Sequence, residues 1–375
     1  MMIKREIEEI VTGKMFSGKA IVIIGARQTG KTTAINHVLE SQKNVLFLNG
    51  DDSFVRNLLK DSNTENIRKV VGNHKIVFID EAQRIESAGL IAKIIVDHFN
   101  DVQLILSGSS AFEIKNNLSE SLTGRKWEYI LYPVTWQELE ETEGYVKSLK
   151  QLELRLIYGM YPEIVTHPAD AQERLKQVVD SYLYRDLLAF ANIKKPEVLE
   201  NLLKALALQM GSEVSYTELA GLLHIDKNTV KSYIEILEKG FIIFTLGSFS
   251  RNLRNELKFA RKVYFWDNGV RNTIVNNFNP LELRQDTGDL WENFMISERL
   301  KRNNFHAPFA KPYFWRTTEQ QEIDYIEENG ENIAAFEFKW NAKKQAKNIQ
   351  SFKNNYNIEI VTVNPDNFRS FIGQS

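Results

Sequence analysis

The sequence predicts an α/β protein of several domains, led by a parallel β-sheet that helices cover on both faces. Between Lys19 and about Pro133, short β-branched runs alternate with longer amphipathic stretches. Continuous apolar strands separated by helices are typical of a buried parallel sheet. A glycine-rich segment, Gly25–Thr32, directly follows the first of these runs. The length of 375 residues corresponds to two or three globular units at roughly 150 residues per domain.

The overall composition excludes several classes of protein. The apolar fraction of 43% and the charged fraction of 26% are those of an ordinary soluble protein. The 47 lysines and arginines are balanced by 49 aspartates and glutamates, so any polyanion site must be a local patch. The absence of cysteine excludes disulfide scaffolds, thiolate zinc sites and cysteine nucleophiles. Because no apolar run approaches the roughly 20 residues that span a bilayer, we expect a cytoplasmic protein without membrane contacts.

The order of elements divides the chain into four stretches. In the first, residues 1–135, five strand-forming runs are expected: Ala20–Ile24, Val45–Leu48, Ile76–Ile79, Leu104–Leu106 and Trp127–Leu131. The pattern then becomes helical, which indicates a helical lid over residues 136–200. A helix–turn–helix–strand pattern with a basic linker follows over residues 201–262, and residues 263–375 mix strands with helices.

The strongest signal for function is the segment after the first strand. Its residues, which match the pattern GxxxxGK[ST], are Gly25, Ala26, Arg27, Gln28, Thr29, Gly30, Lys31 and Thr32. In such a loop the glycines permit a tight turn whose N–H groups converge on phosphate oxygens, and the following helix N-terminus favours negative charge. We therefore expect these residues, together with Thr33, to bind a nucleotide. Lys31 would reach the β- and γ-phosphates, and the Thr32 hydroxyl would ligate Mg²⁺.

A second group of residues indicates nucleotide hydrolysis. A strand-forming run ends in two acids, of which Asp80 would hold Mg²⁺ and Glu81 would polarise the attacking water. Ser109, after the next run, could orient that water, or could simply belong to a serine turn. Arg125 could stabilise charge on the γ-phosphate in the transition state, in cis or from a neighbouring subunit, or could be an ordinary surface arginine.

These motifs, and others in the same order, resemble those of the AAA-type ATPases of bacteria and archaea that carry a C-terminal domain of unknown function. The matching segments are Gly25–Thr32, Asp80-Glu81-Ala82-Gln83, Ser107–Ser110, Gly124-Arg125, Tyr161-Pro162-Glu163, Tyr184-Arg185-Asp186, Tyr264–Gly269, Trp291-Glu292-Asn293 and Glu337-Phe338-Lys339. The resemblance spans essentially the whole chain. It implies ATP as the nucleotide. It also implies a P-loop NTPase sheet in which one inserted strand separates the acid-bearing strand from the glycine-loop strand.

The third stretch has the pattern of a winged-helix domain. Tyr216–Leu223 is expected to form a short helix, and Asp226 would cap a second helix over Lys227–Lys239. The exposed face of the second helix would offer polar residues to a DNA major groove, namely Lys227, Asn228, Lys231 and Ser232. Glu235 and Glu238 oppose this interpretation, and docking of another protein is the alternative. Between Arg251 and Lys262, five basic residues stand against one acid, which fits phosphate binding or a solvated inter-domain helix.

The last stretch contains a second group of residues that could carry chemistry. If Asn329-Gly330 forms a two-residue hairpin turn, period-two geometry places Asp324, Glu337 and Lys339 on one face. Two carboxylates at that separation can share one hard cation, and a neighbouring lysine can activate a metal-bound water. With Glu292 on an earlier helix, this order resembles the PD-(D/E)xK nuclease superfamily, which implies a restriction-endonuclease-like α/β fold. A hairpin with acids on its solvent face is the alternative.

Three functions are compatible with these patterns. The first is an ATP-hydrolysing switch that repositions the winged helix and the nuclease-like domain on a nucleic acid. The second is an ATP-controlled, metal-dependent endonuclease. The third is a nucleotide-gated protein-interaction module without nuclease activity. ATP and Mg²⁺ are the expected cofactors, DNA and other proteins are candidate partners, and Arg125 acting in trans would require an oligomer.

Overall fold

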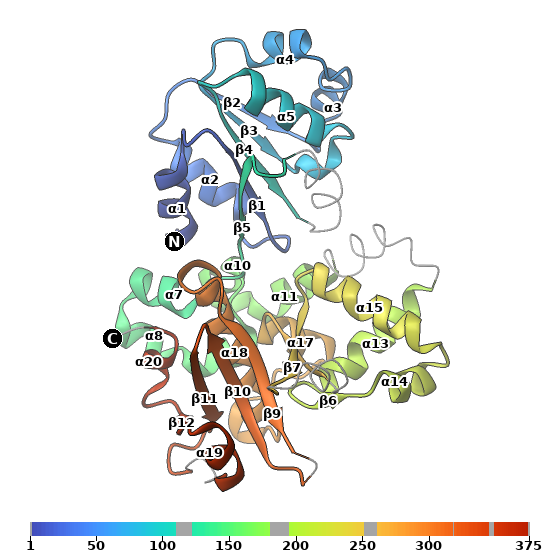
Figure 1. The fold of residues 1–375 in the computed structure, drawn as a ribbon, viewed down its shortest axis with the longest axis vertical. Coiled ribbons are helices and arrows are strands. Elements are labelled where there is room, and N and C mark those ends of the chain that lie inside the picture. Colours follow the sequence, from blue (N-terminus) through green and yellow to red (C-terminus); the bar gives the residue numbers. More distant parts are fainter. Residues whose placement is uncertain are drawn as a thin grey trace. The chain divides into compact units, whose positions relative to one another are not determined.

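The computed structural model describes residues 2–109, 122–180, 195–250, 261–317, 319–344 and 349–373. The chain divides into two compact units, Met1–Val134 and Thr135–Ser375 (Figure 1). Part of the sequence motifs lies outside the described residues, namely Ser110, Tyr184, Arg185, Asp186 and residues 251–260 of the basic stretch. None of the described helices is long and apolar enough to cross a bilayer.

The first unit is built around a sheet of five parallel strands in the order β2-β3-β4-β1-β5 (Figure 1). The strands are β1 (Ala20–Ile24), β2 (Val45–Asn49), β3 (Ile76–Asp80), β4 (Gln103–Gly108) and β5 (Lys126–Ile130). All residues of β1, β3 and β4 are buried, whereas the edge strands β2 and β5 keep partly exposed positions. The apolar runs of the sequence therefore form the centre of a parallel sheet, as predicted.

Helices cover both faces of this sheet. They are α1 (Glu6–Lys14), α2 (Lys31–Leu39), α3 (Ser53–Leu58), α4 (Thr64–Val71) and α5 (Ala88–His98), with a 3₁₀ turn at Ala82–Arg84. The chain crosses the sheet in one direction from β1 to β2, and in the other direction from β2 through β3 to β4. Because crossovers between parallel strands are right-handed, α2 covers one face, and α4 and α5 cover the other.

Strand β4 lies between β1 and β3 and pairs with both. This order confirms the expectation that one inserted strand separates the glycine-loop strand from the acid-bearing strand. Since the strands are parallel, the carboxyl ends of all three meet at one edge of the sheet. The segments that follow them, which include Lys31, Asp80 and Ser109, are therefore neighbours in space.

The second unit contains a seven-stranded sheet in the order β12-β11-β10-β9-β7-β8-β6 (Figure 1). Its strands are β6 (Glu213–Val214), β7 (Ile243–Ser248), β8 (Arg261–Phe265), β9 (Lys311–Arg316), β10 (Glu322–Asn329), β11 (Asn332–Phe338) and β12 (Ile360–Val363). Its described helices are α7 (Trp136–Glu143), α8 (Tyr145–Lys150), α9 (Leu152–Tyr158), α10 (Pro162–Thr166), α11 (Ala171–Val179), α13 (Pro196–Leu208), α14 (Tyr216–Leu223), α15 (Lys227–Lys239), α17 (Asn268–Ile274), α18 (Thr287–His306), α19 (Gln350–Tyr356) and α20 (Phe368–Phe371).

Two of the domain boundaries expected from the sequence fall inside elements of the second unit. The boundary between 200 and 201 lies within α13, and the boundary between 262 and 263 lies within β8. Strand β7 pairs with β8 on one side and with β9 on the other, so the third and fourth stretches share one sheet. The two boundaries as drawn from the sequence therefore cut through elements, while the division into separate domains stays a prediction. Basic residues suggested a linker, but the hydrogen bonds that continue the sheet leave no signal in the sequence.

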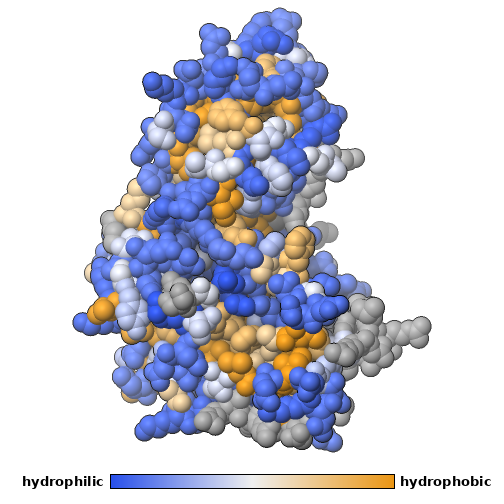
Figure 2. Space-filling model, turned by 60° about the vertical axis from the view of Figure 1, so that its left-hand side comes forward, coloured by the Kyte–Doolittle hydropathy of each residue, from blue (hydrophilic) through white to orange (hydrophobic). Residues whose placement is uncertain are grey.

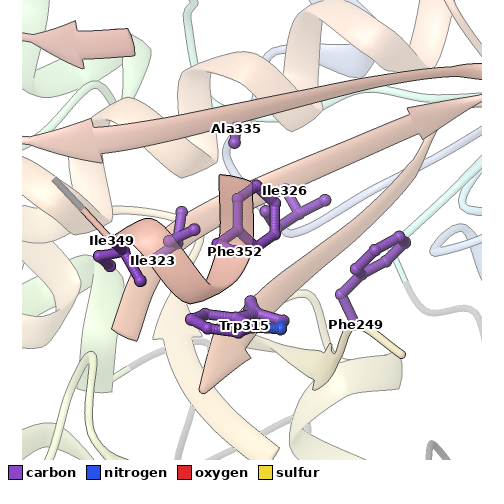
Figure 3. Close-up of a cluster of buried hydrophobic side chains, with 7 residues drawn as sticks. All are labelled: Phe249, Trp315, Ile323, Ile326, Ala335, Ile349 and Phe352. Atoms are coloured by element: carbon purple, nitrogen blue, oxygen red, sulfur yellow. The ribbon is translucent and has the colours of Figure 1, made fainter. Parts of the chain in front are cut away.

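A hydrophobic core underlies the strands β9, β10 and β11 of the second unit (Figure 3). Its buried members are Phe249, Trp315, Ile323, Ile326, Ala335, Ile349 and Phe352. The rings of Trp315 and Phe352 meet edge to face with their centroids 5.1 Å apart. In β10 the buried Ile323 stands between Glu322 and Asp324, and side chains alternate along a strand. The two acids therefore point away from this core.

The surface of the protein is largely polar. Figure 2 shows one face on which hydrophilic side chains cover most of the surface and hydrophobic ones gather in a few patches. Among the described residues, the most exposed large apolar side chains include Phe54, Leu222, Leu283 and Phe309. Leu222 belongs to α14 and is 62% exposed, so the helix–turn–helix segment presents an apolar side chain to solvent.

Candidate functional site

The glycine loop joins β1 to α2 in a conformation that requires glycine at two positions. Gly30 has a φ of 90° and directly precedes α2, and this left-handed conformation disfavours other residues. A Cβ at Gly25 would lie 2.2 Å from the carbonyl oxygen of Leu131, so only glycine lets the loop stay this close to its neighbour. The loop is thereby fixed at the N-terminus of α2, where backbone N–H groups can meet a phosphate.

Lys31 is buried inside the loop with its charge held by backbone carbonyls. Its ammonium donates hydrogen bonds to the carbonyl oxygens of Gly25 at 3.0 Å and Ala26 at 2.7 Å. Burial lowers the pKa of Lys31 to about 8, although Glu81 and Asp80 act in the opposite direction. A bound anion would stabilise the charged form of this lysine and raise its pKa again.

Asp80, the last residue of β3, is bound by hydroxyls from two neighbouring elements. The Thr32 hydroxyl, in the first turn of α2, donates to Asp80 Oδ2 at 2.8 Å. The hydroxyl of Ser107, in β4, donates to the other carboxylate oxygen. Thr32 and Asp80, the two residues expected to hold Mg²⁺, therefore lie side by side. The sequence assigned no separate role to Ser107.

Glu81 and Ser109 are joined through a side chain to which the sequence assigned no role. The Gln83 amide nitrogen donates to Ser109 Oγ at 2.9 Å and also to the Glu81 carboxylate. Glu81 has a φ of 48°, which L-residues rarely adopt, and this conformation turns the chain sharply after Asp80. A Cβ at Gly50 would lie only 2.3 Å from the Glu81 carbonyl oxygen, so glycine there allows the turn.

The remaining residues expected to bind nucleotide differ in exposure. Ala26 and Thr29 are buried, and the Thr29 hydroxyl closes the loop by donating to the Ala26 carbonyl at 2.9 Å. Arg27 is half-buried, and Gln28 and Thr33 are exposed. The exposed side chains are therefore the ones available for contacts with the outer parts of a nucleotide.

Arg5 is part of this site although nothing in the sequence indicated it. Its guanidinium is buried and donates to the carbonyl oxygens of Thr29 at 2.6 Å and Tyr132 at 2.8 Å. The arginine thus ties the glycine loop to the segment that follows β5. A single arginine before a helix carries no pattern, so only the fold could reveal this contact.

Arg125 lies at the wrong edge of the sheet to act on a nucleotide bound by its own chain. It directly precedes β5, and its carbonyl accepts a hydrogen bond from the N–H of Ala20 at the start of β1. The glycine loop begins at the other end of β1, four residues or about 13 Å farther along the strand. The Arg125 Nε donates instead to Asp97 at 2.7 Å. This position argues against a role in cis, and both a role in trans and an ordinary surface arginine stay predictions.

The helix–turn–helix segment forms at the predicted positions. Asp226 caps α15 by accepting hydrogen bonds at 2.9 Å from the N–H groups of Asn228 and Thr229. The residues expected to face a partner, Lys227, Asn228, Lys231 and Ser232, are all exposed. The opposite face is buried through Val230, Ile234 and Leu237.

The hairpin β10–β11 turns one residue later than expected. Asn329 pairs with Asn332, so Gly330-Glu331 is the two-residue turn instead of Asn329-Gly330. Gly330 has a φ of 63°, which suits glycine equally well at either turn position. Both registers keep the same faces, and the Phe338 N–H donates to Asp324 Oδ2 at 2.8 Å.

A buried lysine lies next to Glu292 of the nuclease-like site and to Glu322. Lys262, in β8, has its ammonium 3.5 Å from Glu292 Oε1 and donates a hydrogen bond to Glu322. Burial opposes the charge of Lys262, but Glu292, Glu322 and Asp324 outweigh it and raise the pKa of the lysine. The sequence placed Lys262 in a solvated or phosphate-binding basic stretch. That expectation is corrected, because its side chain is only 2% exposed.

The individual acids of this group are held in different ways. Glu292 accepts a hydrogen bond of 2.6 Å from the Tyr264 hydroxyl, and burial raises the pKa of Glu292 to about 7 against the effect of Lys262. Burial also raises the pKa of Asp324. Glu337 lies 3.5 Å from the ammonium of Lys339. In the described part of the chain, no three histidine, aspartate or glutamate side chains gather closely enough to hold a metal ion.

Comparisons with known proteins agree with the geometry of the first unit. Residues 17–140 match the family model of the AAA domain, so the chain carries an AAA-type P-loop domain. Residues 149–281 and 287–370 match two domains of unknown function, DUF8612 and DUF4143. The resemblance to AAA-type ATPases with a C-terminal domain of unknown function is confirmed. The winged helix and the nuclease-like fold stay predictions.

Two relatives match both units of the chain at low identity. An uncharacterized protein of Methanocaldococcus jannaschii is 24% identical over 402 residues, which cover 98% of this chain and 86% of the relative. An uncharacterized protein of Haemophilus influenzae is 24% identical over 376 residues, which cover 94% of this chain and 88% of the relative.

Solved structures that match part of this chain include two ATPases of Pyrococcus species. The Walker-type ATPase of Pyrococcus abyssi has 15% identity and a TM-score of 0.49, and the match covers 73% of this chain and 96% of that one. A Signal Transduction ATPase with Numerous Domains from Pyrococcus horikoshii has 13% identity and a TM-score of 0.29, with 81% and 47% covered.

Proposed function

We propose that this protein is an ATP-hydrolysing switch whose nucleotide state controls the action of its second unit on DNA. The AAA domain over residues 17–140 supports ATP binding and hydrolysis. The observation that carries the proposal is the meeting of Lys31, Thr32, Asp80 and the Gln83-bridged Ser109 at one edge of the sheet. Each of these groups follows the carboxyl end of a central strand or starts the helix beside it.

Each side chain at this edge has a role in the proposed reaction. Lys31 would neutralise the β- and γ-phosphates, while the loop N–H groups bind their oxygens. Thr32 and Asp80 would hold Mg²⁺, which offsets negative charge on the phosphates. A hydroxyl and a carboxylate fit this ion, because proteins usually supply it with one or two oxygens and leave the rest to water and phosphate. Glu81 would accept a proton from the attacking water, and Ser109 would orient that water.

The second unit is proposed to contact DNA through a winged helix. The chain runs from α13 through β6, α14 and α15 to β7 and β8, and β8 lies between β6 and β7 in the sheet. This succession of elements and strand order supports the proposal of a winged-helix domain. The capped N-terminus of α15 presents Lys227, Asn228 and Lys231 to solvent, which supports docking into a major groove.

The C-terminal stretch is proposed to have a nuclease-like fold. Helix α18 carries Glu292, the hairpin β10–β11 carries Asp324 and Glu337, and Lys339 directly follows β11, an order that resembles that of the PD-(D/E)xK superfamily. The parallel strand β12 extends the hairpin sheet at β11, which also fits a mixed sheet of this kind. Cleavage of DNA by such a fold would depend on bound metal ions.

The test of the switch is ATP hydrolysis with Mg²⁺, measured with and without duplex DNA over a range of salt concentrations. We expect DNA to stimulate hydrolysis. The double variant K227A/K231A should need several-fold more DNA for half-maximal stimulation, because two phosphate or base contacts are lost. Lys204 is an exposed lysine of α13 in the same unit, so K204A is the matched control and should behave as wild type. A hydrolysis rate that stays unchanged when DNA or RNA is added, at every salt concentration, would contradict the proposal.

A nucleotide-gated protein-interaction module is the second candidate function. It is favoured by the exposed Leu222 on α14 and by the acid Glu235, which lies 3.9 Å from Lys231 on the α15 face that would meet DNA. Capture of partners from a lysate, with ATP or with a non-hydrolysed analogue, separates the two functions. Partners that survive nuclease digestion and depend on the nucleotide support the protein module, whereas partners lost on digestion support DNA.

A further inference from the structure

Lys262 stands among acids where a nuclease of the resembled kind would need a divalent metal. The lysine belongs to β8 and is 2% exposed. Its ammonium donates a hydrogen bond to Glu322, lies 3.5 Å from Glu292 Oε1, and is 5.5 Å from the centre of the Phe314 ring. The lysine side chain is therefore more deeply buried than the acids next to it. The acids themselves are more open, with Glu292 15% and Glu322 30% exposed.

The side chains around Lys262 do not fit a metal ion as they stand. Mg²⁺ and Ca²⁺ take oxygen ligands at about 2.0–2.6 Å, and a cation bound to Glu292 or Glu322 at that distance would face the lysine charge at close range. The described residues contain no group of three histidines or acids positioned to hold a metal. The acids nearest to Lys262 therefore already face a buried positive charge, which disfavours a second cation beside them.

Other cationic side chains near these acids also disfavour a bound metal ion. Arg316 lies 3.6 Å from Glu322, and Lys339 lies 3.5 Å from Glu337. Together with Lys262, three cationic side chains face the four carboxyl groups Glu292, Glu322, Asp324 and Glu337. These cationic side chains offset part of the charge of the acids without any bound ion, although Arg316 also pairs with Glu213 at 3.3 Å.

We infer that Lys262 is the resident cation of this site, and that the second unit binds its partner without metal-dependent cleavage. Lys262 links β8, a strand of the proposed winged helix, to α18 and β10 of the nuclease-like stretch. Its ammonium supplies these acids with positive charge that a divalent ion would otherwise have to supply. The inference concerns this group of acids alone and does not depend on ATP hydrolysis.

The test is a titration of nucleotide-free protein with Mn²⁺, in which electron paramagnetic resonance measures the bound ion. The D80N background removes the candidate metal ligand of the first unit. We expect no Mn²⁺ site that depends on Asp324 in the parent protein. K262A should gain one Mn²⁺ per chain with at least about tenfold tighter binding, because a positive charge next to the carboxylates is removed. The variant K262A/D324N should lose that site again.

Two controls separate the role of Lys262 from the general loss of a positive charge. K262R keeps the charge and should bind Mn²⁺ no better than the parent. Lys311 is an exposed lysine at the start of β9, and K311A should likewise gain nothing. A folded K262A that gains no Mn²⁺ site would overturn the inference.

The parent protein alone also provides a test if K262A fails to fold. One Mn²⁺ per chain in the parent protein, lost in D324N, would show a metal site beside the lysine and overturn the inference. Nicking of supercoiled DNA with Mg²⁺ or Mn²⁺ by wild type, abolished in D324N, would overturn it as well. Absence of both agrees with a lysine-held site.

Discussion

The hydroxyl of Thr32 donates a 2.8 Å hydrogen bond to the carboxylate of Asp80, which joins the first turn of α2 to the end of β3. The two residues are 48 positions apart in the chain, and both were expected to hold the same ion. Their contact brings the phosphate loop and the acid-bearing strand into one site. The chemistry proposed for the first unit depends on this junction.

Glu81→Gln is predicted to separate nucleotide binding from hydrolysis. The amide keeps the size of the side chain but cannot accept a proton from water, so the hydrolysis rate should fall by roughly 10²–10⁴-fold. The affinity for ATP should change by less than about tenfold, because the glycine loop and Lys31 are untouched. Single-turnover hydrolysis and calorimetric titration measure the two effects. Equal loss of both would show that Glu81 serves binding and not the chemical step.

Gln83→Leu is predicted to slow hydrolysis through Ser109 and Glu81. The Gln83 amide donates to both side chains, so an apolar replacement of similar size frees them to rotate. We expect kcat to fall and KM for ATP to stay nearly constant, which is the signature of a positioning residue. Ser109→Ala should give a similar fall, and the double variant should be no worse than the more affected single variant. Independent, multiplicative effects would contradict a shared arrangement.

The affinity for ATP is predicted to fall as the pH rises above 8. Burial lowers the pKa of Lys31 to about 8 in the free protein, and bound phosphates favour the charged form. Binding above this pH therefore takes up a proton, and the affinity should fall by up to about tenfold per pH unit. Calorimetry in buffers of different ionisation enthalpy measures the proton uptake. Affinity that is constant between pH 7 and pH 9.5 would be inconsistent with the lowered pKa.

The same pKa shift predicts the stability of the nucleotide-free protein. Between pH 8 and pH 10.5 the unfolded chain keeps the Lys31 proton that the folded protein has lost, so the Lys31 contribution to the free energy of unfolding should increase with pH. Denaturant unfolding of wild type and Lys31→Met isolates this contribution as the difference between the two pH profiles. If the difference in free energy of unfolding between the two proteins does not vary between pH 8 and pH 10.5, the predicted contribution of Lys31 is excluded.

Arg5→Met is predicted to destabilise the first unit and weaken ATP binding. The substitution leaves the carbonyl oxygens of Thr29 and Tyr132 without their buried donor, which should cost about 2–4 kcal/mol. Urea unfolding measures the change. Lys4 is an exposed neighbour that pairs with Glu9 at the surface, so K4A should leave stability within about 0.5 kcal/mol. An unchanged unfolding midpoint for R5M would mean that the loop does not depend on this arginine.

Arg125 lies at the end of β5 away from the glycine loop, which leaves its guanidinium either a role in trans or a surface ion pair with Asp97. If Arg125→Ala loses activity, mixing it with Lys31→Ala should restore part of the hydrolysis, because a mixed oligomer would combine an intact loop with an intact arginine. Asp97→Ala is the control for the ion pair that holds Arg125. Failure of the mixture to regain any activity would leave Arg125 with the ion pair to Asp97 as its role.

The sequence was sufficient for features that depend on local pattern. The strands β1, β3 and β4 were evident as apolar runs, and the glycine loop has a fixed spacing. Contacts between distant positions were not evident. Lys262 looked like one more charge of a basic stretch, because the acids that hold it come much later in the chain. The hairpin turn moved by one residue because Gly330 fits either of two positions, and no neighbouring residue decides between them.

The pairing of β8 with both β6 and β7 has a practical consequence for dividing this protein into pieces. A fragment that begins at Val263 would lack the first two residues of β8, and its partner fragment would end with β7 uncovered along one side. The unpaired backbone groups of an exposed strand edge can pair with other chains, so both fragments should aggregate or associate. Expression of Thr135–Ser375 as a single piece keeps every strand of this sheet with its neighbours.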